Sequence, residues 1–473
     1  MKHNLVIPCS GPGSRSSSYS KFHKALIQVG GCAVIDHIIH AFPTAETVYV
    51  LLGHNREYIE QYLKHAQYEN VECINIPNWE ESQISSLQQI PDYVFDMPFY
   101  LNSCDNWSPN IPSATENTVY LCRPENMSYY DAVSDSAFAG IGFVAEPDLF
   151  YRELHKISAT RNDYLVYNQL PTLNEVMLDE WYDVGNAESY ELTRENFPEK
   201  FDLLDKHHQE IYYTNNRIVK LFNKPVDNIK ESIETSKSFP HPSPVLYTEK
   251  GLSYDFVEGE SNAVGENYRK VLDNLSRLWT YCIQNNTSVD STKIWKHKTQ
   301  ERFDMMIRKY PEFGKPIVIN GTEIDPIRTI ETLDWAMLNS GIYGPCHGDL
   351  ILENIIVTDN GIQYIDHREG IVEDIFYDIC KFYHNLHLNN INMKQFSLNI
   401  DDNKYIVDIP YFNQKRVLSF CETEIYKTYK RKIELGVGCI WLSMAPLNVS
   451  DELNKFLFLY AINHMNGVKN GNG

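Results

Sequence analysis

Residues 1–198 alternate short apolar runs with amphipathic segments, and this alternation constrains the fold more than any other feature of the chain. Runs such as NLVIPCS, TVYVLLG and PFYLNS are typical of buried strands. Segments such as NREYIEQYLKHA place their apolar side chains on one helical face, with Asn55 as the expected N-cap. This succession of strand and helix favours a doubly wound (Rossmann-like) α/β fold with a mostly parallel sheet. The ligand site of such a sheet lies at the carboxyl ends of its strands.

The pattern changes after residue 198. EIYYTNNRIVKLF predicts a β-hairpin that turns at Asn215 and Asn216, because asparagine tolerates the left-handed backbone conformation. LSYDFVEGE predicts another strand, and most of the chain beyond it has helical periodicity. In YRKVLDNLSRLWTYC one helical face carries Tyr268, Leu272, Leu275, Trp279 and Cys282. We expect a second, two-lobed α+β domain over residues 199–473, with a β-rich lobe at about 205–260 and a helical lobe at about 261–473.

The composition limits the partners and the compartment. Acidic residues outnumber basic ones by 63 to 42, and the net charge of −21 argues against nucleic acid or an anionic membrane surface as a partner. The N-terminus lacks the pattern of a signal peptide, and no apolar run approaches the ~20 residues that span a bilayer. Ten scattered cysteines form no CxxC pair, which is typical of reduced thiols. We expect a cytoplasmic protein without membrane insertion that acts on small molecules.

A glycine-rich loop directly follows the first predicted strand. In VIPCSGPGSR, Gly11, Gly13 and Ser14 can turn backbone N–H groups toward a phosphate chain, and Arg15 adds a positive charge. Lys24 follows in the next segment. A loop of this kind after a strand is also compatible with a simple tight turn. The function of the loop therefore depends on what else the sequence brings to the same end of the sheet.

Two acidic residues are candidates for a metal site at this loop. Asp105 ends an apolar strand in LNSCDNW, and Asp183 stands beside Gly185 in DEWYDVGNAESY. Two carboxylates at strand ends can hold one Mg²⁺ against a nucleoside triphosphate. An acidic residue in the turn after a strand is also a common structural feature. Asp105 and Asp183 therefore indicate a metal site only in combination with the glycine-rich loop and Lys24.

The combined pattern resembles the nucleotidyltransferases that make activated sugars and amino alcohols, whose signature reads roughly GxGxR…PK.L…G, a strand-end Asp, then W.D.G…Y. The resemblance covers residues 1 to about 195. It implies that the nucleotide phosphates are held by Gly11, Gly13, Ser14 and Arg15. It also implies that Lys24 stabilises charge as pyrophosphate leaves, and that Asp105 and Asp183 bind Mg²⁺. His23 stands where that family usually has Pro, and Ser16, Ser17 and Ser18 replace an apolar residue.

A second polar cluster lies in CHGDLILENIIV, residues 346–357. Phosphoryl transfer to a hydroxyl needs a carboxylate for the proton, ligands for Mg²⁺ and a cation on the nucleotide phosphates. Asp349 can serve as the carboxylate, while the amide oxygen of Asn354 and the strand-end Asp366 can bind the metal. Lys220, in RIVKLF, is the candidate cation, although a lysine on an edge strand is often simply solvated. Arg368 could meet a phosphate or an anionic substrate, or form a surface ion pair.

These residues are similar to the aminoglycoside- and choline-kinase group, a small-molecule branch of the protein-kinase fold. Its pattern is HGDxxxxN followed by a strand that ends in ID, and the resemblance covers residues 205–473. It implies that Asp349 is the catalytic base, that Asn354 and Asp366 are the metal ligands, and that His347 is a structural part of the catalytic loop. It also places the base of the nucleotide near the backbone of Val257.

Together the two halves predict a bifunctional enzyme. The C-terminal half would phosphorylate a small hydroxyl compound (an amino alcohol, a polyol or a sugar) with ATP. The N-terminal half would couple that phosphate to CTP or UTP and release pyrophosphate, with Mg²⁺ at both sites. The product would be an activated precursor for capsule or lipopolysaccharide. Two alternatives remain: only one half is catalytic and the other binds a nucleotide or a partner, or the protein is a non-catalytic scaffold.

Overall fold

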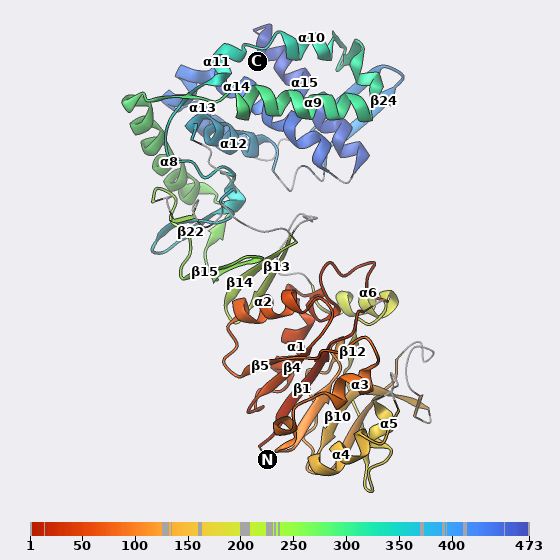
Figure 1. Ribbon diagram of the computed structural model, residues 1–473. Helices are drawn as coiled ribbons and strands as arrows, with labels where there is room; N and C mark the ends of the chain where they lie inside the picture. Colours follow the sequence, from red (N-terminus) through yellow and green to blue (C-terminus); the bar gives the residue numbers. More distant parts are fainter. Residues whose placement is uncertain are drawn as a thin grey trace. The chain divides into compact units, whose positions relative to one another are not determined.

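The computed structural model forms two compact units (Figure 1). The first unit comprises Met1–Val226 and Ser243–Phe256, and the second comprises Asp227–Pro242 and Val257–Gly473. The structure describes residues 2–13, 15–124, 132–133, 135–158, 163–198, 209–223, 230, 233–234, 237–368, 373–389, 393, 395–409, 414–448 and 450–471.

A mixed β-sheet forms the centre of the first unit, with the strand order β11-β8-β10-β6-β1-β4-β5. Its strands are β1 (Asn4–Cys9), β4 (Val48–Leu52), β5 (Val71–Asn75), β6 (Phe99–Asn102), β8 (Thr118–Cys122), β10 (Ser136–Val144) and β11 (Asn174–Met177). β9 (Ala132–Val133) pairs with β10. The run β5-β4-β1-β6 is parallel, as the sequence predicts, but β10 is antiparallel to both β6 and β8. The apolar pattern of a buried strand is the same in either direction, so it does not predict this reversal.

Helices cover both faces of this sheet. Leu5 and Ile7 of β1 pack with α1 and α2, whereas Val6 packs with α3, α4 and α5 on the opposite face. The helices are α1 (Val34–Ala41), α2 (Arg56–Ala66), α3 (Gln83–Gln88), α4 (Pro147–Leu154), α5 (Tyr164–Tyr167) and α6 (Ala187–Asn196). The doubly wound arrangement is therefore confirmed. Asn55 precedes α2 as expected, but its side-chain amide donates to the backbone oxygen of Phe22 at 2.7 Å and does not cap the helix.

Two short ladders and a second sheet complete the first unit. The ladders are β2 (Gln28–Val29) with β3 (Cys32–Ala33), and β7 (Asn106–Trp107) with β12 (Tyr182–Asp183). The antiparallel sheet consists of β13 (Gln209–Thr214), β14 (Arg217–Phe222), β16 (Gly251–Asp255) and β15 (Val245–Thr248). The predicted hairpin turns at Asn215 and Asn216, with φ of 48° and 56°. His65 of α2 is hydrogen-bonded to Thr248 (2.7 Å) and Ser253 (3.0 Å), which joins this sheet to the first unit rather than to the helical one.

The second unit is mainly helical around one hydrophobic core. Its helices are α8 (Gly265–Asn285), α9 (Lys298–Lys309), α10 (Pro326–Glu331), α11 (Trp335–Asn339), α12 (Ile375–His387), α13 (Gln414–Cys421), α14 (Glu424–Met444) and α15 (Asp451–Lys469). All five apolar residues predicted for one face of α8 are buried. Among the described residues, no helix is both long and apolar enough to span a membrane.

Short strands flank these helices. One sheet contains β17 (Glu260–Ser261), β22 (Ile355–Thr358) and β23 (Gly361–Tyr364). A second contains β20 (Thr322–Ile324), β19 (Ile317–Ile319), β25 (Lys404–Asp408) and β24 (Ser397–Asp401), and a third pairs β18 (Ser288–Asp290) with β21 (Ser340–Ile342). The HGDLILEN segment lies immediately before β22, and β23 ends just before Asp366. The β22–β23 hairpin therefore places the two predicted metal-ligand segments next to each other.

Candidate active site

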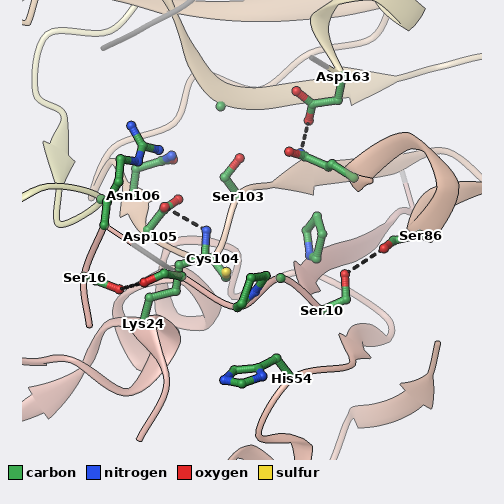
Figure 2. Close-up of a pocket in the computed structure, with 18 of the residues that line it drawn as sticks. Ser10, Ser16, Lys24, His54, Ser86, Ser103, Cys104, Asp105, Asn106 and Asp163 are labelled. Atoms are coloured by element: carbon green, nitrogen blue, oxygen red, sulfur yellow. Dashed lines mark hydrogen bonds and ion pairs between the residues drawn. The ribbon is translucent and has the colours of Figure 1, made fainter. Parts of the chain in front are cut away.

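A cleft of about 760 Å³ opens at the carboxyl ends of β1 and β6 in the first unit (Figure 2). The strands β4 and β5 lie on one side of β1 and β6 lies on the other, so the strand order reverses at this point. Open α/β sheets bind ligands at such a reversal, because the loops after neighbouring strands separate there. The loop after β1 supplies Gly11, Gly13, Arg15 and Lys24 to the cleft.

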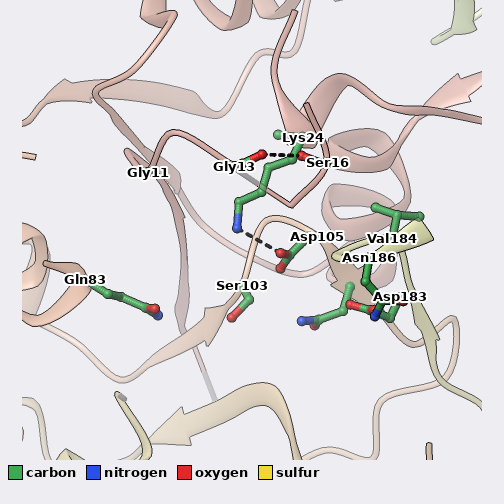
Figure 3. Close-up of polar contacts among 12 residues, drawn as sticks. Gly11, Gly13, Ser16, Lys24, Gln83, Ser103, Asp105, Asp183, Val184 and Asn186 are labelled. Carbon is green, nitrogen blue, oxygen red and sulfur yellow. Dashed lines mark hydrogen bonds and ion pairs between the residues drawn. The ribbon is translucent and has the colours of Figure 1, made fainter. Parts of the chain in front are cut away.

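Lys24 and Asp105 form an ion pair in this cleft. The Lys24 Nζ lies 2.8 Å from Asp105 Oδ2, and Figure 3 shows the ammonium group directed at the carboxylate. Burial disfavours the charged form of both groups, but their mutual attraction outweighs it. The pKa of Asp105 is therefore lowered and that of Lys24 is raised. Both side chains are charged at neutral pH.

Asp183 lies next to this pair, although it is far away in the sequence. The ladder between β7 and β12 sets Asp183 opposite Asn106, and the Val184 N–H donates to the Asp105 backbone oxygen at 2.8 Å. A Cβ placed on Gly185 would lie 3.1 Å from Asp105 Oδ2 and 3.2 Å from Asp183 Oδ1. The two carboxylates therefore lie on either side of the same small space beside Gly185, which a larger side chain would crowd.

The chemistry of these groups fits Mg²⁺. Two carboxylate oxygens face the same space, and the buried amide oxygen of Asn106, in the same cleft, has no hydrogen-bond partner among the described residues. Oxygen ligands of this kind suit Mg²⁺, which usually takes only one or two carboxylates and completes its shell with water and phosphate oxygens. Within the described ranges, no cluster of three or more His, Cys, Asp or Glu side chains is suited to a metal.

The glycine-rich loop has the conformation that its sequence suggests. Gly13 has φ of +60°, and its carbonyl accepts hydrogen bonds from both the N–H (3.0 Å) and the hydroxyl (2.9 Å) of the buried Ser16. The serine that departs from the family signature therefore tightens the loop. No atom lies within 4 Å of a Cβ placed on Gly11, so a phosphate has room at its backbone. Ser14 lies outside the described residues.

His23, the other departure from that signature, joins the loop to Lys24. It caps the short helix Lys24–Leu26, where the Ala25 N–H donates to Nδ1 at 3.1 Å, and its Nε2 lies 3.2 Å from the Gly11 oxygen. The ring is buried, and burial together with the Lys24 charge lowers the pKa of His23 to about 3. A neutral ring that accepts at Nδ1 and donates at Nε2 satisfies both contacts. The sequence alone gave no indication of this role.

Other residues of the cleft were also not identified from the sequence. Gln83 donates to Asp163 Oδ2 at 2.9 Å, and the Trp181 indole N–H donates to the Ala139 oxygen at 3.0 Å. Tyr19, which does not line the cleft, donates to the Val184 oxygen at 2.8 Å and so contacts the segment that follows Asp183. These residues come from separate loops, and no short motif connects them. Only Trp181, in the W.D.G motif, carried a signal in the sequence.

The N-terminal part of the chain is similar in fold to solved nucleotidyltransferases. CTP:phosphocholine cytidylyltransferase from Streptococcus pneumoniae is 14% identical over 42% of this chain and 100% of that chain, with a TM-score of 0.35. The inositol-1-phosphate CTP transferase from T. maritima is 13% identical over 41% of this chain and 95% of that chain (TM-score 0.34). A UDP-glucose pyrophosphorylase complexed with UDP-glucose is 14% identical over 42% of this chain and 98% of that chain (TM-score 0.35). No protein-family model and no curated protein matches the chain.

The HGD segment of the second unit is held by a buried carboxylate. Asp378 of α12 accepts the backbone N–H of His347 at 2.6 Å and that of Gly348 at 2.9 Å. Burial raises the pKa of Asp378 to about 7, although both hydrogen bonds act in the opposite direction. His347 is buried as well; its Nε2 lies 2.9 Å from the Ile365 oxygen, and burial lowers its pKa to about 4. Both side chains thus fix the backbone of the loop.

The side chains predicted for phosphoryl transfer surround this loop. Asp349 forms an ion pair with Lys381 of α12 at 2.7 Å, and Asn354 Nδ2 donates to the Asp349 backbone oxygen at 2.9 Å. The Asn354 amide oxygen therefore points away from that contact, as a metal ligand must. Asp366 has φ of +62°, a left-handed conformation that costs a non-glycine residue about 1–3 kcal/mol and is concentrated at functional sites.

The two residues predicted to bind the nucleotide of this site fall in different units. Lys220 lies on β14, between β13 and β16, so it is on an inner strand and not on an edge. It is only 2% exposed, and its ammonium lies 5.6 Å from the ring centroid of Tyr254. Lys220 belongs to the first unit, while Val257, half-buried, begins the second segment of the second unit. Their roles in nucleotide binding stay predictions.

Proposed function

We propose that the first unit is a nucleotidyltransferase that joins the phosphate of a small molecule to CTP or UTP. One observation carries this proposal: Lys24, Asp105 and Asp183 converge at the carboxyl ends of β1 and β6, beside a glycine-rich loop. A cation and two carboxylates beside open backbone N–H groups suit a nucleoside triphosphate and its metal. The likeness to solved structures concerns the fold alone, so the activity rests on this geometry.

The reaction needs positioning and charge more than proton transfer. An oxygen of the substrate phosphate forms a bond to the α-phosphorus, the bond from that phosphorus to the bridging oxygen breaks, and pyrophosphate leaves with the electron pair. The attacking phosphate is already ionised, so no general base is required. Lys24 stabilises the charge that develops at the α-phosphate, and Arg15 with the loop amides holds the departing phosphates. Asp105 and Asp183 would hold Mg²⁺, which would supply further charge neutralisation.

We propose further that the second unit transfers the γ-phosphoryl group of ATP to a hydroxyl. Asp349 accepts the hydroxyl proton, and its ion pair with Lys381 keeps the carboxylate charged before the reaction. Asn354 and Asp366 would hold Mg²⁺, which neutralises charge on the β- and γ-phosphates. Asp378 and His347 keep the loop in place. The phosphorylated product would then be the substrate of the first unit, as a precursor for capsule or lipopolysaccharide.

Each activity has its own assay on the full-length protein. With Mg²⁺, CTP or UTP, and phosphocholine, glucose 1-phosphate or glycerol 3-phosphate as probes, we expect pyrophosphate release that Asp105→Asn abolishes. Asp148→Asn, an exposed substitution on α4, is the matched control. With Mg²⁺ and ATP, acceptor-dependent ADP formation should be lost in Asp349→Asn and retained in Asp304→Asn, an exposed change on α9. Activity in only one assay would support the alternative of a single catalytic half.

A further inference from the structure

Three cationic side chains gather around one buried phenol beside Asp349. Lys298 begins α9, Arg368 follows Asp366 by two positions, and Lys381 lies on α12 one helical turn after Tyr377. We call Lys298, Arg368, Lys381 and Tyr377 the cation cluster. Lys381 forms an ion pair with Asp349. The proposed phosphoryl transfer assigns no role to Lys298 or Arg368.

Lys298 and Arg368 converge on a single oxygen. Lys298 Nζ donates to the Tyr377 hydroxyl at 3.1 Å, and Arg368 Nη1 donates to the same atom. The ammonium lies 5.2 Å and the guanidinium carbon 5.8 Å from the centroid of the Tyr377 ring. Burial raises the pKa of the Tyr377 phenol, but the three cations outweigh burial and lower it overall. These cations therefore favour the ionised form of the phenol.

Trp295, three positions before Lys298, packs against the same tyrosine. The indole N–H of Trp295 donates to Asp374 Oδ2 at 3.0 Å, which ties the start of α9 to the start of α12. The Trp295 ring also packs against Tyr377, with 5.6 Å between the centroids. Trp295 and Lys298 therefore both contact Tyr377.

Lys298 carries a charge that no described carboxylate neutralises through an ion pair. The net charge is −21, yet no carboxylate in the described part of the chain forms an ion pair with Lys298. An anion bound beside the Lys298 ammonium would neutralise that charge. Arg368 is exposed and Lys298 is half-buried, so a small molecule can reach both.

We propose that the acceptor of the second unit carries an anionic group, a carboxylate or a phosphate ester, in addition to the hydroxyl that is phosphorylated. This inference rests on the proposed kinase function of Asp349. Lys298 and Arg368 bind the anionic group at Tyr377, and the hydroxyl faces Asp349, the ion-pair partner of Lys381, which lies one helical turn after Tyr377 on α12. The acceptor is therefore a compact hydroxy acid or phosphorylated polyol, and not a choline-like cation.

The transfer step is balanced within this arrangement. The hydroxyl oxygen forms a bond to the γ-phosphorus of ATP, and the bond from that phosphorus to the β,γ-bridging oxygen breaks. ADP leaves with the electron pair, and the hydroxyl proton passes to Asp349. The anionic group of the acceptor takes no part in the bond changes. It serves to orient the hydroxyl, so its loss should raise KM more than it lowers kcat.

The first experiment compares matched acceptors with the full-length protein, Mg²⁺ and ATP. Glycerate, glycerol 3-phosphate, glycerol and choline are supplied separately, and ADP formation is measured. We expect kcat/KM for glycerate or glycerol 3-phosphate to exceed that for glycerol and choline at least tenfold, and the two anions to show whether the site takes a carboxylate or a phosphate. A preference for glycerol or choline would overturn this inference and leave the kinase assignment intact.

The second experiment tests the residues. Lys298→Gln and Arg368→Gln should each raise KM for the preferred anion about tenfold or more, because a charge-assisted hydrogen bond is lost. KM for ATP should not change, Lys298→Arg should retain most of the affinity, and Lys296→Gln, an exposed lysine nearby, is the control. A rise in KM for ATP instead would assign the cations to the nucleotide and contradict the proposal.

A third measurement separates failure of this inference from failure of the kinase assignment. If no acceptor supports ADP formation, or Asp349→Asn forms ADP as fast as the wild type, the kinase assignment is wrong. Binding of glycerate and glycerol 3-phosphate to the full-length protein is then measured by calorimetry. If the wild type binds neither anion, or if the wild type and Lys298→Gln bind the anions with the same affinity, the proposed anion site is wrong as well.

Discussion

Each unit contains a lysine–aspartate pair of almost the same length, but the surroundings of the two pairs differ. Lys24 and Asp105 lie 2.8 Å apart, and the carboxylate of Asp183 converges on the same space. Lys381 and Asp349 lie 2.7 Å apart, beside the further cations of the cluster. The first pair has an additional acid as neighbour, and the second has additional bases.

This difference matches the chemistry that we propose for each unit. A phosphate that attacks a nucleotide is already ionised, so Asp105 serves better as a metal ligand than as a base, and a second carboxylate helps it. A hydroxyl must lose a proton, so Asp349 must remain charged and without metal. Nearby cations favour that charged form. The same pair of residue types can therefore serve different roles according to its neighbours.

The strongest test of this comparison is the removal of Asp349 as a base. Asp349→Asn keeps the size of the side chain but cannot accept the proton, so ADP formation should fall by about 10²–10⁴-fold. Pyrophosphate release from a supplied phosphate ester should be unchanged. Steady-state assays of both products on the same preparation check this. Equal losses in both assays would point to a folding defect and not to chemistry.

Removal of Lys24 should affect the other product. Without this cation the charge at the α-phosphate is less well stabilised, and we expect pyrophosphate release to fall by about 10²–10³-fold. Lys64→Ala, an exposed change on α2, is the control. If Lys24→Ala released pyrophosphate at the wild-type rate, the pair with Asp105 would have only a structural role.

The buried His23 makes the stability of the first unit sensitive to acid. Its folded pKa is about 3 and its ordinary value is 6.5. Because the unfolded chain takes up a proton between pH 7 and pH 5 and the native ring does not, stability should fall with acidification, by about 2 kcal/mol from this group. The free energy of unfolding of the wild type and of His23→Asn, determined with urea at pH 7 and at pH 5, measures this loss of stability. An equal loss in both proteins would show that other groups dominate.

The smallest effect is expected at Tyr19. Tyr19→Phe removes the hydrogen bond to the Val184 oxygen, which should cost about 1 kcal/mol of stability and slow pyrophosphate release only a few-fold, through Asp183. ADP formation is the internal control and should not change. A loss as large as that of Lys24→Ala would mean that Tyr19 contacts the substrate.

Short motifs predicted those parts of the structure that depend on local sequence. The parallel strands around β1, the Asn215–Asn216 turn and the buried face of α8 all follow from apolar periodicity and turn chemistry. The resemblance of the motifs predicted that Asp105 and Asp183 act together, whereas the ladder between β7 and β12 that brings them together was not predicted. Their catalytic and metal-binding roles stay predictions.

The features that the sequence did not predict depend on contacts between distant segments. The direction of β10, the inner position of Lys220 and the link from His23 to Gly11 have no periodic or local signature. The cation cluster likewise joins residues of α9, α12 and the segment after β23. The composition gives only the total charge of the chain, which is negative. A local group of basic residues therefore cannot be recognised from it.

The central claim is that one chain phosphorylates a compound and then joins it to a nucleotide. The most direct test is the mass of the nucleotide product after incubation with Mg²⁺, ATP, CTP, UTP and the three acceptors that carry no phosphate, glycerate, glycerol and choline. We predict a conjugate of the nucleoside monophosphate with the phosphorylated acceptor. It should be absent for Asp349→Asn, while Lys24→Ala should accumulate the phosphorylated acceptor alone. A conjugate that forms without ATP, or equally in Asp349→Asn, would contradict the account.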